Sequence, residues 1–552
     1  MNIRFSILGL VALCVMAFTP AIPVHAQSDS ALLDALVKKG VLSDQDAEDI
    51  RATEEKDYAT TGASKIVLSD AVKTIQFYGD LRLRYELRDG AEGSQTVTSG
   101  TPSTTAAQTG RNGDSEDMNR WRYRLRLGVK GELYDNFFYG IRAATNVGYN
   151  RSGNVTFGAS QGFGPFGKGR SIMGIDQVYL GWHATPDITL TGGQFPNPFY
   201  TTSLIWDDNL NPAGAAEGYD HTFGNTEVFA TAGQFVYAAA AGSGITNGIG
   251  AGSTTNNVFM YGEQIGFKYK FDDNTFYKGA ATFYTYSGTS SLAVAGTPAA
   301  DFPAAGNGTL AAAGTGNTSP SDFNGPFVGS VSGPNSNIGG INNLAVLEVP
   351  MEFDFKIGPG VHTVTSGDPK DMKDVTSVTT GWTIPMRLFA DFAYNVEADE
   401  RADAARTAER TALAGTSNVG ILSGTPATSS TSLNLLDTGK GILDQTAYQV
   451  GIEAGQLKKK GDWDTKLFWQ STGYYAVDPN LIDADTFNAA TNLQGVVVSA
   501  SYNWTDGLTS TVRYAHAMPV NGLLATPNVQ QDLQEGDIKQ YNLLQADLLW
   551  KF

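Results

Sequence analysis

The sequence YNLLQADLLWKF, residues Tyr541 to Phe552, ends the chain and decides its fold class. Every second residue is apolar: Leu544, Ala546, Leu548, Trp550 and Phe552. The alternate positions are largely polar, with Leu549 as an apolar exception. Because successive side chains of a strand point to opposite sides, this period of two predicts a β-strand with one apolar face. The stretch alone would also fit the last strand of a soluble sandwich.

The same alternation recurs along most of the chain after residue 73. It is clearest in four stretches, Thr74 to Arg88, Asn119 to Glu132, Val258 to Phe271 and Gln494 to Trp504. These stretches exceed the average soluble strand of about 5 to 6 residues. They are long enough for a tilted strand to cross a bilayer, which takes about 9 to 11 residues. The pattern therefore predicts strands that span a membrane.

Short and long connections alternate between these strands. The short ones are rich in Asp, Asn, Gly and Pro, as tight turns are: Tyr134 to Asn136, Thr185 to Asp187, Asp272 to Asn274, Lys460 to Asp462 and Thr505 to Gly507. The long ones, rich in Gly, Ser, Thr and Ala, include 89–118, 150–171, 288–340 and 397–443. Short turns at one rim and long loops at the other are typical of outer-membrane barrels, in which the short turns face the periplasm.

The strand count follows from this alternation. Asp187 to Phe195 and Val258 to Phe271 must run in opposite directions, and Thr226 to Ala239 is the clear strand between them. The count closes if Ala213 to Phe223 is a weak strand that turns at Gly224 and Asn225. The prediction is an all-β, closed antiparallel transmembrane barrel of about 16 strands, with 14 and 18 as alternatives. The connection 358–381 is the other doubtful point, because it is long for a periplasmic turn.

The first 26 residues have the pattern of a secretory signal peptide. Arg4 precedes an apolar run from Phe5 to Phe18, and Val24 and Ala26 fit the cleavage position. A membrane anchor is the alternative, but the run is short and prolines follow it. Cys14 suggests a lipoprotein, yet Leu13 is too large for that processing site. The expected parts are a signal peptide at 1–26, a periplasmic helical segment and linker at 27–73, and a barrel at 74–552.

Composition excludes several classes of protein. The formal charge of −18, or −19 without Arg4, argues against binding to nucleic acid. Without Cys14 the chain has no cysteine, so neither disulfides nor a thiol mechanism is available. A membrane-spanning helix needs about 18 consecutive apolar residues, and no segment after the signal peptide has a run of this length.

Residues 28–57 are the one region with helical spacing. Leu32, Leu33, Leu36 and Val37 share a face, Gly40 can end the helix, and Ser43 with Asp46 forms a capping-box pattern. The stretch ALLDALVKKGVLSDQDAEDI, followed by a strand-rich region and a terminal Phe, resembles the amino-terminal signature of the "putative porin" family of Gram-negative bacteria. A periplasmic hairpin that packs on a neighbouring subunit or on peptidoglycan, and a weakly ordered leader, are both open interpretations of 28–57.

The resemblance carries expectations about function and partners. It implies a cell outer-membrane porin, a water-filled channel through which small hydrophilic solutes and ions diffuse. It also implies contact with outer-membrane lipid and lipopolysaccharide, and association into homotrimers. The ending, with Leu548, Trp550 and Phe552, resembles the signal read by the barrel-assembly machinery.

The inward face of the first strands is predicted to be strongly basic. A barrel of about 16 strands is too wide for side chains to fill, so its interior should hold water. The residues opposite the apolar parity form this basic wall: Arg82, Arg84, Arg88, Arg120, Arg122, Arg124, Arg126, Lys130 and Arg142. Cations this close on strands about 4.8 Å apart need solvent or facing acids. The basic wall predicts a lean toward anions.

The facing acids are expected on the third long loop, Pro196 to Pro212. This loop carries Asp207 and Asp208, and in general diffusion porins, which the layout resembles, the third loop folds inward and narrows the pore. A loop that stays at the surface is the alternative.

An enzyme is not expected. His183, His221, His362 and His516 lie beside no recognisable nucleophile motif, and no zinc, phosphate-loop or calcium-loop pattern occurs. Neither a cofactor nor a metal is predicted. The remaining alternatives to a general porin are a channel selective for phosphate or an oligosaccharide, and a tether between the outer membrane and the cell wall.

Overall fold

The computed structural model describes most of the strand-forming part of the chain. The described ranges are 71–92, 96–97, 108–109, 115–145, 153–158, 173–238, 258–287, 344–359, 362–366, 376–402, 441–478, 481–487, 489–521 and 538–552, together with 37–39, 43, 45–48, 50 and 69. The chain divides into two compact units, Met1–Asp70 and Ala71–Phe552.

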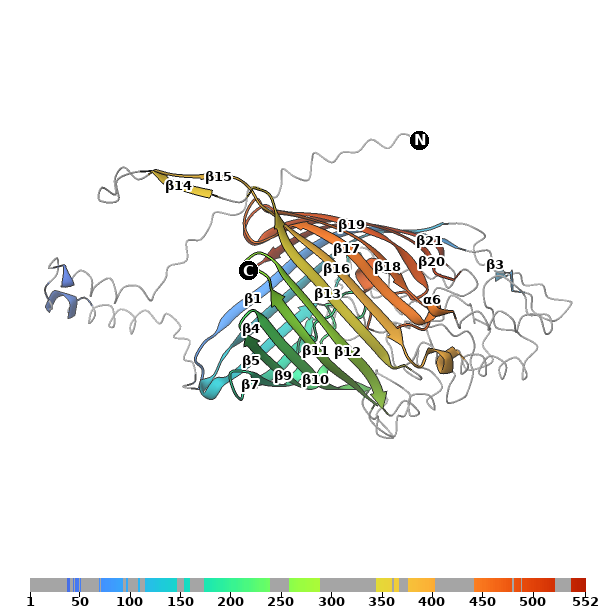
Figure 1. The fold of residues 1–552 in the computed structure, drawn as a ribbon, viewed down its shortest axis with the longest axis horizontal. Helices are drawn as coiled ribbons and strands as arrows, with labels where there is room; N and C mark the ends of the chain where they lie inside the picture. Colours follow the sequence, from blue (N-terminus) through green and yellow to red (C-terminus); the bar gives the residue numbers. More distant parts are fainter. Residues whose placement is uncertain are drawn as a thin grey trace. The chain divides into compact units, whose positions relative to one another are not determined.

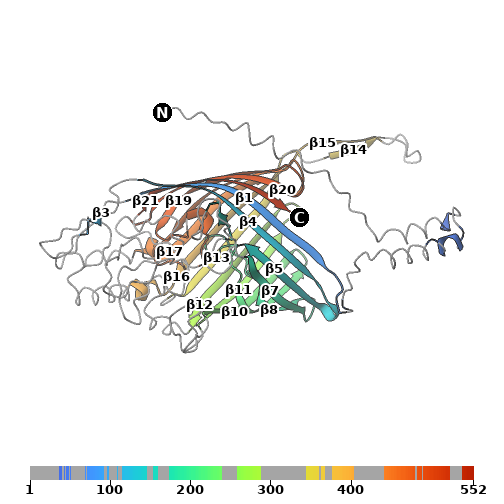
Figure 2. The same cartoon turned by 180° about the vertical axis from the view of Figure 1, so that it is seen from behind.

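Within the described ranges of the second unit, sixteen long strands form one closed antiparallel sheet (Figures 1 and 2). In ring order they are β1 (Gln76–Glu92), β4 (Ser115–Glu132), β5 (Phe137–Thr145), β7 (Met173–His183), β8 (Ile188–Gln194), β9 (Ala213–Phe223), β10 (Thr226–Ala238), β11 (Val258–Lys270), β12 (Phe276–Ser287), β13 (Val346–Ile357), β16 (Ile384–Asn395), β17 (Thr446–Gly455), β18 (Trp463–Thr472), β19 (Leu493–Asn503), β20 (Leu508–Pro519) and β21 (Ile538–Lys551). The ring closes because β1 pairs with β4 on one side and with β21 on the other. The predicted 16-stranded barrel is confirmed.

Two doubtful points of the strand count are resolved by the structure. The weak strand is β9, which pairs with β8 and β10 and turns into β10 at Gly224 and Asn225. The long connection between β13 and β16 contains a separate hairpin of β14 (His362–Ser366) and β15 (Thr376–Thr380). This hairpin accounts for the length of the connection, and because its strands pair only with each other it leaves the number of barrel strands even. Shorter pieces are β2 (Thr96–Val97) paired with β3 (Gln108–Thr109), and β6 (Val155–Thr156) on β4.

The predicted tight turns all lie at one end of the barrel, here called the turn end, and the long connections leave from the loop end. Tyr134–Asn136 forms a short 3-10 turn, η1, in which Asp135 and Asn136 adopt positive φ angles of 59° and 63°. Asp and Asn are the non-glycine residues that tolerate this backbone conformation best. The expected loops 89–118, 150–171, 288–340 and 397–443 fall mainly outside the described residues.

The two faces of the sheet differ as the alternation predicts. Leu83, Trp121, Leu127, Val178 and Leu548 point outward and are exposed. The intervening arginines point inward, where Arg84 and Arg88 are almost completely buried. Glu217 on β9 and Glu263 on β11 share the outward parity and are exceptions to the apolar outer face.

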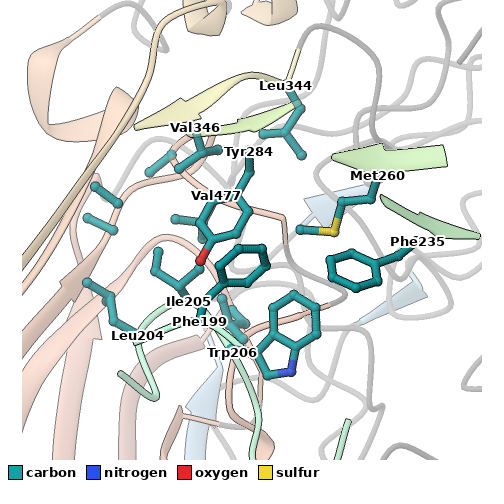
Figure 3. Close-up of a cluster of buried hydrophobic side chains, with 14 of the residues drawn as sticks. Phe199, Leu204, Ile205, Trp206, Phe235, Met260, Tyr284, Leu344, Val346 and Val477 are labelled. Atoms are coloured by element: carbon teal, nitrogen blue, oxygen red, sulfur yellow. The ribbon is translucent and has the colours of Figure 1, made fainter. Parts of the chain in front are cut away.

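The interior of the barrel is packed near the loop end. Residues 195–212, between β8 and β9, and the described residues of 473–492, between β18 and β19, bury apolar side chains against the inner faces of β9 to β17. Phe199, Leu204, Ile205, Trp206 and Val477 meet Phe235, Met260, Tyr284 and Val346 in this cluster (Figure 3). A second cluster joins Phe487 and Ala490 to Leu493, Tyr541 and Leu543. Two inward segments therefore occupy the loop end of the lumen.

The first unit is described only at a few positions. Residues 45–48 are helical, and the predicted capping box is present: the Asp46 backbone N–H donates to Ser43 Oγ at 3.1 Å, and Ser43 N–H donates to Asp46 Oδ2 at 3.2 Å. The expected signal peptide at 1–26 and most of 28–57 lie outside the described residues. Within the described part of the chain, no helix has the length and apolarity required to span a membrane.

Candidate functional site in the lumen

The basic wall lies on the inner faces of β1, β4 and β5. The register places Arg82 directly opposite Arg124 and Arg84 directly opposite Arg122, so the crowding of cations expected from the sequence is present. Lys130 lies farther toward the turn end, with its ammonium 5.3 Å from the centre of the Tyr78 ring. Like charges in direct opposition destabilise a sheet unless acids neutralise them.

Acids on the same strands provide much of this neutralisation. Asp80 accepts from Arg124 Nη2 at 2.9 Å and from Arg126 Nε at 2.6 Å. The fully buried Glu86 accepts from Arg88 Nε at 3.1 Å and from Arg120 Nε at 2.8 Å. Hydrogen bonds between ionised groups are roughly twice as strong as neutral ones, so these acids hold the arginines in fixed positions.

Neighbouring strands add two further carboxylates. Asp176 on β7 binds Arg142, with Nη2 to Oδ2 at 2.6 Å. Asp547 on β21 binds Arg84 through Nε at 2.7 Å and Nη2 at 2.8 Å. Sequence reasoning missed Asp80, Glu86, Asp176 and Asp547 as partners. Asp80 and Glu86 have the same parity as the arginines on their own strand, and this signal was available in the sequence.

The acid that reaches the wall from a loop is Asp485, which sequence reasoning also missed. It lies in α7 (Ala484–Phe487), within the inward segment 473–492. Its Oδ1 accepts from Arg84 Nη1 at 2.6 Å, and its Oδ2 accepts from Arg84 Nη2 at 3.0 Å and from Arg82 Nη1 at 3.4 Å. Burial would raise the pKa of Asp485, but Arg84 and Arg82 outweigh it and hold that pKa well below its usual range.

The third long loop does lie inside the barrel, anchored to the wall opposite the arginines. Thr201 Oγ1 donates to Glu348 on β13, and Thr202 Oγ1 donates to Asp391 on β16 at 2.5 Å. Tyr200 exchanges two hydrogen bonds with the side chain of Gln264 on β11, at 2.8 and 2.9 Å.

The two predicted loop acids do not pair with the basic wall in the described part of the chain. Asp207 is fully buried and accepts from Asn209 N at 2.8 Å and from Ala484 N at 3.3 Å. Its burial, together with the nearby Asp483 and Asp485 carboxylates, raises the pKa of Asp207 to about 7. Asp208 is exposed and faces a cavity. Arg142 of the basic wall lines the same cavity as Asp208, but the loop acid in direct contact with the wall arginines is Asp485.

A cavity of about 510 Å³ lies between the third loop and the walls on either side of it. Among the described residues, its charged lining comprises three bases and three acids: Arg142, Arg387, Lys466, Asp208, Glu352 and Glu453. Arg387 is held by Asp354, with Nε to Oδ1 at 2.9 Å and Nη2 to Oδ2 at 3.0 Å. Tyr200, Trp206 and Phe389 add apolar surface. The cavity can contact both charges and the apolar part of a small solute.

The described residues include no group of three or more His, Cys, Asp and Glu side chains placed to hold a metal ion. Of the carboxy-terminal residues, Leu548 and Trp550 face outward, and the Phe552 ring lies 5.0 Å from that of Trp550. Phe552 extends the seam between β21 and β1, because its backbone exchanges hydrogen bonds with Gly79 at 2.9 and 3.1 Å.

Comparison with known proteins gives a family match for part of the chain. Residues 63–307 match the family model described as "Putative porin". The match covers β1 to β12 and confirms the family resemblance, although it leaves out the segment 31–50 and the terminal strand that suggested it. No curated protein sequence matches the chain.

Several solved structures are distantly similar. Pseudomonas putida OprB is 9% identical with a TM-score of 0.38, covering 90% of this chain and 97% of that chain. The outer membrane channel DcaP of Acinetobacter baumannii is 13% identical with a TM-score of 0.34, covering 88% and 99%. A mutant of the Rh. blastica porin is 7% identical with a TM-score of 0.33, covering 87% and 100%. Similarities this distant assign no function to the chain.

Proposed function

We propose, from the match of residues 63–307 to the "putative porin" family, that this chain forms an outer-membrane channel for small hydrophilic solutes and ions. The observation that carries the proposal is a closed ring of sixteen strands, among the described residues, with an apolar outside and a charged inside. A ring of this size encloses more space than its inward side chains can fill. An apolar outer belt of tilted strands suits a bilayer.

Conductance of single molecules tests the channel directly. The full-length mature chain, added to a planar lipid bilayer, is expected to produce discrete current steps in potassium chloride. A barrel that inserts but passes no current would contradict the proposal.

We also propose a preference for anions, although the structure leaves less net positive charge on the wall than the sequence suggested. The wall arginines favour anions, but Asp80, Glu86, Asp176, Asp485 and Asp547 neutralise much of their charge. The cavity lining is balanced between bases and acids in the described part of the chain. We therefore expect a weak anion preference, measured as the reversal potential in a salt gradient, and a clear cation preference would contradict it.

A substrate-selective channel is the second candidate, and the two inward segments favour it. Segments 195–212 and 473–492 narrow the lumen beyond what a single loop would do, and segment 195–212 places Trp206 and Tyr200 at the cavity. Swelling of proteoliposomes across a series of solutes separates the candidates. A smooth decline of rate with solute size indicates a sieve, whereas saturation by one solute indicates a binding site.

Association into homotrimers is also proposed, through the apolar outer wall. Leu83, Leu127, Ile175 and Leu180 are exposed on β1, β4 and β7 and provide a surface that lipid or another subunit can cover. Cross-linking of the purified chain in detergent is expected to give a three-subunit product.

A further inference from the structure

The contact between Asp485 and the basic wall has the geometry of ligand recognition. Arg84 presents Nη1 and Nη2 to the two oxygens of Asp485 at 2.6 and 3.0 Å, and Arg82 adds a third donor at 3.4 Å. Two parallel bonds from one guanidinium are the arrangement by which arginine binds carboxylates with geometric specificity. The Asp485 side chain therefore occupies a complete carboxylate-binding site.

The wall side of this site is fixed independently of Asp485. Asp547 on β21 binds Arg84 through Nε and Nη2, at 2.7 and 2.8 Å, and so orients the guanidinium from the barrel itself. Two other side chains of the wall donate to the backbone of the same turn: Arg88 Nη2 donates to Ala484 O at 3.2 Å, and Gln545 Nε2 donates to Asp485 O at 3.0 Å. If residues 484 and 485 moved away, these donors would face the lumen.

Asp485 differs from the other acids of the wall because it lies on a connecting segment and not on a strand of the ring. Asp80, Glu86 and Asp547 lie on strands of the ring, and the sheet fixes them. Asp485 lies on a connection between β18 and β19, so no strand pairing of the ring depends on it. Asp485 is thus a tethered group in a site whose other parts are fixed.

We propose that the Arg82–Arg84 site binds the carboxylate of a small organic acid in the lumen, and that Asp485 is a built-in competitor for it. This inference rests on the proposed channel function. An incoming carboxylate accepts the two hydrogen bonds that Arg84 Nη1 and Nη2 now donate to Asp485, and no covalent bond changes. The occupied site slows anionic solutes in the lumen, while Asp485 limits their affinity and so allows their release.

The experiment uses acetate as the probe and the full-length chain in planar bilayers. The concentration of acetate that halves the chloride current is measured at constant ionic strength, with acetamide as a neutral analogue of the same shape. In Asp485→Asn the competitor loses its charge, and we expect the half-blocking concentration to fall by about tenfold, as a gain of one good charged contact implies. Acetamide is expected to have no effect on any variant.

Asp483→Asn is the matched control, because it removes a charge from the same segment. Asp483 accepts from Asp485 N at 3.0 Å and from Thr486 Oγ1 at 2.8 Å, and it makes no ion pair among the described residues. It is expected to respond to acetate as the wild type does. The double variant Asp485→Asn with Arg84→Lys keeps the positive charge of the wall but loses the two parallel N–H donors of the guanidinium. Its half-blocking concentration of acetate should return toward that of the wild type.

The outcomes separate this inference from the channel itself. A wild-type chain without current contradicts the channel. A conducting chain in which Asp485→Asn leaves the acetate response unchanged, or in which Asp483→Asn changes it equally, overturns the carboxylate site alone. Retention of the tenfold gain in the Arg84→Lys double variant overturns it as well.

Discussion

Asp207 shows how one buried residue couples the two inward segments. Its backbone N–H donates to Leu481 O at 2.6 Å, its carboxylate accepts from Ala484 N, and Asp483 N–H donates to Ser203 O at 3.2 Å. These contacts join segment 195–212 to segment 473–492. Burial, followed by the charges of Asp483 and Asp485, raises the pKa of Asp207 to about 7.

The raised pKa predicts that the joint between the segments weakens as pH rises. A carboxyl group that binds its proton more tightly when folded gives stability that is fully present below its unfolded pKa of 3.8 and is lost as pH rises through about 7. Amide exchange in 200–210, corrected for the intrinsic rate, should show protection that falls by about tenfold or more between pH 5 and 8.

The neutral variant Asp207→Asn provides the control for this pH effect. It keeps the shape of the side chain and cannot ionise, so its protection should not vary with pH over the same interval. A wild type whose protection is as constant as that of the variant would contradict the prediction.

At the scale of elements, hydroxyl groups fix the third loop to the far wall. Thr201 and Thr202 each donate to a buried carboxyl group, Glu348 and Asp391 respectively, and Tyr284 OH donates to Glu348 at 2.8 Å. Each lost donor would leave a buried oxygen unsatisfied, at a cost of about 1–3 kcal/mol. The loop position therefore depends on two adjacent side chains.

The double variant Thr201→Val with Thr202→Val tests this anchor. Valine keeps the volume of threonine and removes both donors, so the loop should leave the wall more often. We expect a noisier current and a higher mean single-channel conductance. Thr285→Val on β12, an outward position, is the matched control. Currents identical to those of the wild type would show that the hydroxyls do not hold the loop.

At the scale of the whole molecule, closure of the ring depends on close contact at the seam of β1 and β21. A Cβ placed on Gly79 would lie 2.5 Å from Arg126 O and 2.7 Å from an atom of the Phe552 ring. Glycine is therefore required where the terminal residue and β4 approach β1 from two sides. The carboxy-terminal aromatic residue packs on the seam as well as ending the chain.

Gly79→Ala is expected to destabilise the closed barrel. The backbone oxygen of Arg126 cannot move as a side chain can, and overpacking of this kind costs about 1–3 kcal/mol. The measurement is the temperature at which the compact band of the barrel disappears on an unheated gel, which should fall. Gly218→Ala is the control, because its nearest heavy atom is Thr189 O at 3.8 Å. Equal effects of both substitutions would contradict the prediction.

The sequence by itself determined the strands and the two faces of the wall. A period of two is a local property, so Leu548 and Trp550 point outward, and Arg84 and Arg122 inward, in any sheet that these segments form. Turn residues such as Asp135 and Asn136 are equally local, since their backbone conformation depends on the residue type. The local signals gave about 16 strands with 14 and 18 as alternatives, and the pairing of β9 with β8 and β10 decided the count.

The tertiary structure alone decided which groups neutralise the basic wall and what fills the lumen. Arg84 and Asp485 are 401 residues apart in the chain, and no periodicity relates a loop to the wall on which it packs. The position of such a loop depends on the buried apolar area and the ion pairs that it gains against the entropy of ordering it. These terms are defined only once the ring has closed, and for this reason Asp207 and Asp208 were expected where Asp485 is found.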